Sequence, residues 1–140
     1  MIKLKRWLIL AFTLSVGITV GVLSSHISAA DSMPVRQTKL IQTDLVGGGG
    51  RKANMYVTEI APGVDGGLHY HHAHTFVYVL DGSITIEAPG ESPVTYHAGE
   101  AFHELPMKPH DARNASTTTP VRILVFQAPK KGQPLTEMVK

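Results

Sequence analysis

The chain has 140 residues, of which 43% are hydrophobic, and it carries 13 Lys and Arg, 11 Asp and Glu and no cysteine. The lack of cysteine excludes disulfide bonds, thiolate metal ligands and cysteine nucleophiles. Three of the basic residues lie among the first six, so the chain after residue 30 has ten basic and 11 acidic residues and a net charge of −1. That part lacks the basic stripe of a nucleic-acid-binding protein, and nucleic acid is not an expected partner.

The first 30 residues have the three-part layout of a secretory signal peptide. The basic start MIKLKR is followed by an apolar run over residues 7–23, and then by Ser28, Ala29 and Ala30 before Asp31. We expect cleavage near Asp31 and a mature protein that is periplasmic or extracellular. The alternative is an uncleaved membrane anchor, because seventeen apolar residues reach the lower limit for a spanning helix.

The rest of the chain predicts a single all-β domain. Short apolar segments alternate with Gly- and Pro-containing turns, and we expect strands over residues 55–60, 76–80, 83–87, 94–97, 101–105 and 122–126. Strands at this spacing favour a sandwich or a barrel, and no segment shows a convincing helical period. We expect the barrel to cover residues 51–128. Residues 31–50, with a flexible run of four glycines, are expected as an extension before it, and residues 129–140 as a polar tail.

Seven of the eight histidines lie between positions 69 and 110. Alternate side chains of a strand share a face, so His69 and His71 are expected to point the same way. Two inward imidazoles at this spacing can both reach one cation, at the distance of about 2.0–2.1 Å that is usual between zinc and nitrogen. His110, which follows a turn containing Pro106 and Pro109, is the third candidate ligand.

The spacing of these residues resembles the two motifs of the cupin superfamily, which comprises small metal-binding β-barrels. The first motif is a glycine, five residues, His-x-His, three or four residues, Glu, six residues and a glycine, matched here by Gly63, His69, His71, Thr75 and Gly82. The second is a glycine, five residues, Pro-x-Gly, two residues, His, three residues and Asn, matched by Gly99, Leu105, Pro106, Met107, His110 and Asn114. The resemblance covers roughly residues 40–127 and implies a double-stranded β-helix, or jelly-roll, barrel.

One departure from the first motif bears on the site. Thr75 takes the position of the usual glutamate ligand, and a threonine hydroxyl binds a divalent cation poorly. Glu104 is the better candidate for the missing carboxylate, because it is expected to share an inward strand face with Phe102. A buried carboxylate is costly unless it binds a metal or exchanges a proton, so Glu104 is expected as a metal ligand or a catalytic acid/base. His74 is the other candidate for a fourth ligand, although strand alternation turns it away from the face of Thr75.

Two further departures lie in the second motif. Leu105 and Met107 stand where the motif has Pro and Gly, while Pro106 and Pro109 stiffen the turn instead. We interpret both as structural substitutions.

Three neutral imidazoles, with or without a carboxylate, suit one divalent transition metal, which is Fe, Mn, Zn, Ni or Cu. Open coordination positions are typical of catalytic rather than structural sites. Because iron held by three histidines resembles the centres of dioxygenases, the expected function is an exported metal-dependent oxidoreductase acting on a small organic molecule. The alternatives are a metal-dependent isomerase or lyase, and a non-catalytic module that binds a small ligand or the metal itself. Family members often pair, which leaves a homodimer open.

Overall fold

The computed structural model describes residues 34–140, and the whole of the predicted leader lies outside the described residues. Residues 34–140 contain no helix that is long and apolar enough to cross a membrane. Their regular structure is ten β-strands: β1 (Val35–Asp44), β2 (Lys52–Ile60), β3 (His69–Tyr70), β4 (Thr75–Asp81), β5 (Ser83–Glu87), β6 (Val94–His97), β7 (Ala101–Glu104), β8 (Asp111–Asn114), β9 (Val121–Gln127) and β10 (Glu137–Met138). The prediction of an all-β domain is confirmed.

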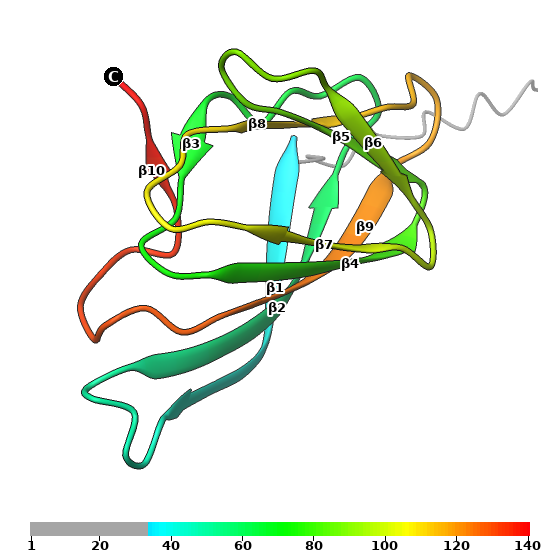
Figure 1. Cartoon of the computed structure of the whole chain (residues 1–140). Helices are drawn as coiled ribbons and strands as arrows, with labels where there is room; N and C mark the ends of the chain where they lie inside the picture. The colour runs from blue at the N-terminus through cyan, green and yellow to red at the C-terminus, as the bar shows by residue number, and fades with distance from the viewer. Residues whose placement is uncertain (1–33) are drawn as a thin grey trace, which may run out of the picture. The chain divides into compact units, whose positions relative to one another are not determined.

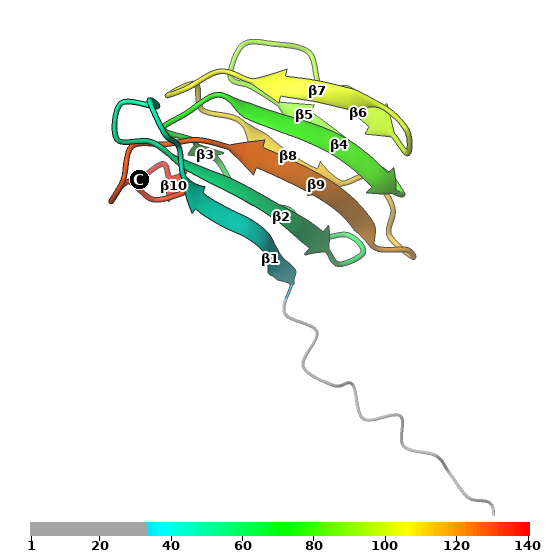
Figure 2. The same cartoon turned by 90° about the horizontal axis from the view of Figure 1, so that it is seen from below.

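The strands form two facing layers (Figure 1). One layer is a five-stranded sheet in the order β1-β2-β9-β4-β7, and its strands lie side by side in Figure 2. The other layer contains the three-stranded sheet β6-β5-β8, beside the short pair β10-β3. All pairings are antiparallel, and strands distant in sequence become neighbours, as in β5 with β8 and β2 with β9. This is a jelly-roll arrangement, as the resemblance of the two motifs implies.

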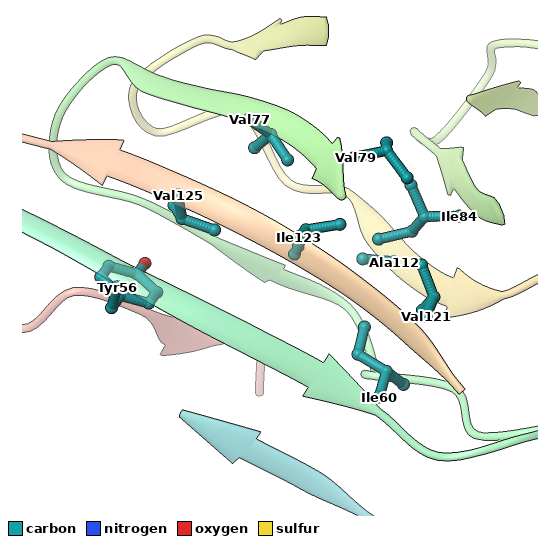
Figure 3. Packing of buried hydrophobic residues seen from close by; sticks show 9 residues of the cluster. All are labelled: Tyr56, Ile60, Val77, Val79, Ile84, Ala112, Val121, Ile123 and Val125. Atoms are coloured by element: carbon teal, nitrogen blue, oxygen red, sulfur yellow. The ribbon is translucent and has the colours of Figure 1, made fainter. Parts of the chain in front are cut away.

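The core lies between the two layers because the apolar residues of the central strands alternate with outward ones. In β9, Val121, Ile123 and Val125 are buried, and each is separated from the next by a more exposed residue. They meet inward residues of both sheets in the cluster of Figure 3: Tyr56, Ile60, Val77, Val79, Ile84, Ala112, Val121, Ile123 and Val125. Each fully buried Val or Ile stabilises the folded state by about 1.5–3 kcal/mol relative to an exposed one, so this cluster holds the two sheets together.

The two ends of the domain depart from the predicted extension and tail. Residues 31–50 include β1, which pairs with β2 from Val35 opposite Ile60 to Asp44 opposite Lys52. Residues 129–140 include β10, which pairs with β3. Every residue of β1 is exposed, so its sequence lacks the alternation of buried and exposed positions that predicts the other strands. A strand of two residues, such as β10, leaves no period to detect.

Candidate metal centre

Three histidines meet where β3 faces the start of β8. The backbones of His69 and His110 exchange two hydrogen bonds, each of 2.9 Å between N and O, so the two residues stand directly opposite each other. His71 follows β3, and its ring centroid lies 5.1 Å from that of His69 and 5.3 Å from that of His110. One nitrogen from each ring lies within 4.8 Å of the others, and no more than 9% of each residue is exposed.

Each of these imidazoles uses its Nδ1 atom for a hydrogen bond to a backbone carbonyl. His69 Nδ1 donates to Gly67 O at 2.6 Å, His71 Nδ1 to Leu135 O at 2.7 Å and His110 Nδ1 to Lys108 O at 3.1 Å. Since a carbonyl only accepts, each Nδ1 carries a hydrogen, and in the neutral ring each Nε2 then has a lone pair. Metal-binding histidines in proteins are held in the same way.

Glu104 brings a carboxylate to the same place. In β7 it pairs with Thr75 of β4, so both side chains lie on one face of the five-stranded sheet. Its Oε2 lies 3.2 Å from His71 Nε2, and its Oε1 lies 3.1 Å from His110 Nε2. Only 9% of the Glu104 side chain is exposed, so the charge has little contact with water.

The pKa values of Glu104, His69 and His110 indicate that this cluster binds a positive charge. Burial by itself raises the pKa of Glu104, but the imidazoles of His110 and His71 outweigh it when they are protonated, and lower the pKa to about 2. Burial lowers the pKa of His69, whereas for His110 the effect of Glu104 prevails over burial and the pKa is raised. The Nε2 lone pair of a neutral imidazole and a carboxylate oxygen repel each other. A cation or a proton must therefore lie between them. His110 Nε2 is buried and makes no hydrogen bond, although Glu104 Oε1 lies only 3.1 Å away. The cluster therefore fits a metal cation.

Two other residues considered from the sequence, Thr75 and His74, do not contribute a ligand atom to the cluster. Thr75 is only 1% exposed, and its hydroxyl donates to Ala73 O at 3.3 Å. His74 points away from the cluster and contacts the exposed His103, with 2.8 Å between the ring nitrogens. The structure thus brings His69, His71, His110 and Glu104 together and leaves His74 outside.

The chain matches the sequence profile of the cupin domain over residues 56–127, which is just over half of its length. This protein is a cupin. The match includes both histidine motifs and Glu104, so the residues of the cluster all belong to the shared domain. No curated protein matches the cupin in sequence.

Solved structures with the same fold are distant in sequence. A protein with a double-stranded β-helix domain from Klebsiella pneumoniae has a TM-score of 0.61 and 16% identity, and the match covers 78% of the cupin and 87% of that chain. The polyketide cyclase RemF from Streptomyces resistomycificus has a TM-score of 0.59 and 21% identity, and the match covers 77% of the cupin and 74% of the cyclase chain. The DMSP lyase DddQ from Ruegeria pomeroyi has a TM-score of 0.60 and 18% identity, with 83% of the cupin but only 57% of the lyase covered.

Two cavities reach the histidine cluster of the cupin. The inner one has a volume of about 210 Å³ and lies between the sheets, where Val77, Ile84 and Val125 line it beside His69, His71 and Glu104. The outer one has a volume of about 180 Å³ and reaches Glu104 and His110 past Tyr96 and Phe102. Glu104 lines both cavities.

A turn and the C-terminal segment position the cluster in ways that the motifs do not reveal. Met107 N donates to His71 O at 2.8 Å, which ties the turn before His110 to His71. Leu135 supplies the carbonyl for His71 Nδ1 from 64 residues away in sequence. Residues 135–139 (LTEMV) do not alternate between apolar and polar side chains, so their sequence gives no signal of the strand.

Proposed function

We propose that the cupin is a metal-dependent enzyme whose single divalent transition metal is held by His69, His71, His110 and Glu104. The observation that carries the proposal is the convergence of three imidazoles whose Nε2 lone pairs are all directed by backbone carbonyls at Nδ1. A buried carboxylate beside them completes the donor set. Nitrogen and carboxylate donors suit Fe, Mn, Zn, Ni and Cu, so the donors alone do not select one metal.

The distances of Glu104 support its role as a ligand. Two donor atoms on one ion, each about 2.1 Å away and at 90–110° to each other, lie roughly 3.0–3.4 Å apart. The two contacts of the carboxylate with His71 Nε2 and His110 Nε2, at 3.2 and 3.1 Å, have this length. Glu104 would thereby supply, from the neighbouring strand, the carboxylate that the family motif places at Thr75.

The inner cavity limits the substrate to a small and largely apolar molecule. At about 210 Å³ it is smaller than the pockets of roughly 300–1,000 Å³ that hold drug-sized ligands. Its walls are mainly aliphatic, whereas the polar groups of His69, His71 and Glu104 gather at one side. Such a cavity suits a compact hydrocarbon body with one or two oxygen atoms directed towards the histidines.

The reaction class that we propose is an oxidoreduction of this small organic molecule. A bound divalent metal supplies Lewis acidity and, where it is redox-active, electron transfer with dioxygen. The chain contributes the rest: the backbone carbonyls orient the imidazoles, and the aliphatic walls exclude water. Glu104 is ionised at neutral pH, so it can serve as an anionic metal ligand, and a carboxylate oxygen that is not bound to the metal can accept a proton from the substrate.

A metal-dependent lyase or isomerase is the second candidate, and the position of Glu104 favours it. A carboxylate that borders both cavities could remove a proton from a substrate in either one. Proteins described as DMSP lyases and as a polyketide cyclase have this fold, which is compatible with such chemistry.

The test combines elemental analysis of the purified protein with activity assays. The oxidoreductase predicts tightly bound iron or another redox metal, and oxygen uptake with catechols, flavonols or diketones. Tight metal without oxygen uptake, but with conversion under argon, would identify the lyase or isomerase. Loose and unselective metal binding without turnover would support the non-catalytic binding module and contradict both enzymes.

We further propose that the enzyme works outside the cytoplasm after removal of residues 1–30. The basic start, apolar run and small residues before Asp31 support this. N-terminal sequencing of the protein from cell fractions tests it. A mature chain that starts near Asp31 outside the cytoplasm is expected, and an intact first residue on a membrane-bound protein would contradict it.

A further inference from the structure

The C-terminal strap, which we define as residues 134–139, runs alongside β3 and the histidine cluster. Its strand β10 pairs with β3, with Glu137 opposite Tyr70 and Met138 opposite His69 (Figure 1). Val139 N donates a further hydrogen bond of 2.9 Å to Leu68 O. The strap therefore lies directly against the strand that carries the first candidate ligand.

Inside the domain, the strap contacts a second candidate ligand. Leu135 O accepts the hydrogen bond from His71 Nδ1 at 2.7 Å, and Thr136 Oγ1 lies 3.5 Å from the same atom. The acceptors for His69 and His110 each lie only two residues away in sequence, in Gly67 and Lys108. Among the three imidazoles, His71 alone takes its backbone acceptor from a distant segment.

The strap also covers the backbone that orients His69. Gly67 has a φ of +78°, and a Cβ atom built there would lie 2.8 Å from Met138 Cε. Gly67 O is the acceptor for His69 Nδ1, so Met138 packs onto the turn that fixes this ring. Thr136 lines the inner cavity, and Leu135 packs against the core cluster.

We propose that the strap is a positioning element of the metal centre, which presents the Nε2 lone pair of His71 to the metal by holding the hydrogen of that ring on Nδ1. This inference rests on the proposed metal site and adds a part of the chain outside the cupin motifs to it. Without Leu135 O, the neutral ring can carry its hydrogen on either nitrogen and can rotate. Both changes lower the fraction of the protein that is ready to bind metal.

The contribution of the strap to metal binding can be separated from its contribution to folding. The strap contains no residue of the buried core cluster, and Leu135 is only partly buried against it. Its strand comprises two residues and pairs only with β3. The two larger sheets do not include it, so we expect the barrel to fold without the strap.

Three variants, one shortened and two of full length, test the proposal. The first ends at Gln133 and lacks the strap. The second, Val139→Pro, removes the N–H that bonds to Leu68 O and loosens the strap without shortening it. The third, Val139→Ala, is the matched control, because it changes the same partly exposed side chain and keeps the N–H. Circular dichroism establishes that each variant is folded.

Zn²⁺ affinity, measured by competition with a coloured chelator, is the first readout. Loss of an outer partner of a metal-binding histidine typically costs about 10–100-fold in affinity, and we expect this loss for the chain ending at Gln133. The Zn²⁺ affinity of Val139→Pro should fall several-fold, and that of Val139→Ala should stay within about twofold of the affinity of the natural chain. The second readout is ¹⁵N NMR of the imidazole of His71 in metal-free protein, which reports the nitrogen that carries the hydrogen.

The two readouts together decide the proposal. It is supported when the loss of Zn²⁺ affinity accompanies a shift of the His71 hydrogen away from Nδ1. A folded chain ending at Gln133 that binds Zn²⁺ as tightly as the natural chain would overturn it, and so would a loss of affinity with an unchanged His71 ring. If the shortened chain does not fold, the comparison of Val139→Pro with Val139→Ala decides the proposal by the same two readouts. If the natural chain binds no metal, the proposed function fails, whereas the NMR comparison still decides whether the strap orients His71.

Discussion

Glu104 and Thr75 stand opposite each other on β7 and β4, and this pairing explains an unusual feature of the sequence. The motif position of the carboxylate holds Thr75, whose hydroxyl is turned to the backbone, while the facing strand supplies a carboxylate beside His71 and His110. A directly paired residue on the same face of a sheet lies about 4.5–5.5 Å away between Cβ atoms, so the longer Glu104 side chain spans the difference. The position of Glu104 on the inward face follows from strand alternation, but its pairing with Thr75 depends on a register that the sequence does not reveal.

We expect Glu104→Gln to weaken metal binding or turnover at least about tenfold, because glutamine keeps the size but loses the charge and the proton-accepting oxygen. His74→Ala is the control, since His74 is an exposed histidine that contacts His103 rather than the cluster. Metal titration and steady-state kinetics of both variants measure the effect. If Glu104→Gln left metal binding and turnover unchanged while His74→Ala abolished them, His74 and not Glu104 would be the fourth ligand.

Tyr56 is the residue whose ionisation we expect to limit stability at high pH. Burial raises its pKa from 10.0 to about 12, although the hydrogen bond from Gln127 Nε2 partly opposes the rise. In the unfolded chain the phenol ionises near its ordinary pKa, so the stability contributed by Tyr56 is complete below pH 10 and is lost as the pH rises towards 12. The difference between the folded and unfolded pKa values of Tyr56 corresponds to about 2–3 kcal/mol in the free energy of unfolding.

Comparison of the natural chain with Tyr56→Phe tests this expectation. The difference in tyrosinate absorbance between the two proteins follows Tyr56 alone among the four tyrosines. Ionisation of Tyr56 near pH 10 in the folded protein would contradict the burial argument.

Among the secondary-structure elements, the longer central strands are predicted best, because their burial alternates along the sequence. β2, β4 and β9 alternate between buried and more exposed residues over most of their length, and the predicted bounds of all three lie within a few residues of the observed ones. β1 is exposed throughout, and β3 and β10 have only two residues each, so these strands show no period. The turn before His110 is recognisable from its spacing, but its backbone conformation depends on contacts across the fold.

That turn contains Met107, which has a φ of +60° and occupies the glycine position of the motif. A side chain in this left-handed region costs about 1–2 kcal/mol, and part of this cost is offset because glycine has more freedom in the unfolded chain. We therefore expect Met107→Gly to raise the free energy of unfolding by up to about 1 kcal/mol, because the exposed side chain loses little packing.

Denaturant unfolding of the metal-free protein measures the effect of Met107→Gly. Met107→Ala is a useful control, since alanine keeps the left-handed strain and shortens the side chain. Lower stability of the glycine variant than of the alanine variant would show that the turn is not strained. Metal affinity should stay unchanged in both, because the hydrogen bond from the residue 107 backbone N–H to His71 O remains.

Across the whole domain, residues far apart in sequence converge on one site. His69 and His71 come from the segment around β3, Glu104 from β7 and His110 from the position just before β8, while the strap supplies the acceptor for His71. Motif spacing is sufficient to predict the cupin barrel and the histidines, because the family constrains the distances between them along the chain. The strap lies outside both motifs, so its approach to His71 follows only from three-dimensional pairing with β3.

The metal centre is tested most directly by calorimetric titration of the metal-free protein with a divalent metal, with His71→Ala and His74→Ala measured beside it. We expect one equivalent of divalent metal to bind to the natural chain and to His74→Ala. We expect no stoichiometric binding to His71→Ala, with all three proteins equally folded by circular dichroism. Full metal occupancy in a folded His71→Ala, or the absence of metal binding in the natural chain, would contradict the assignment of the centre.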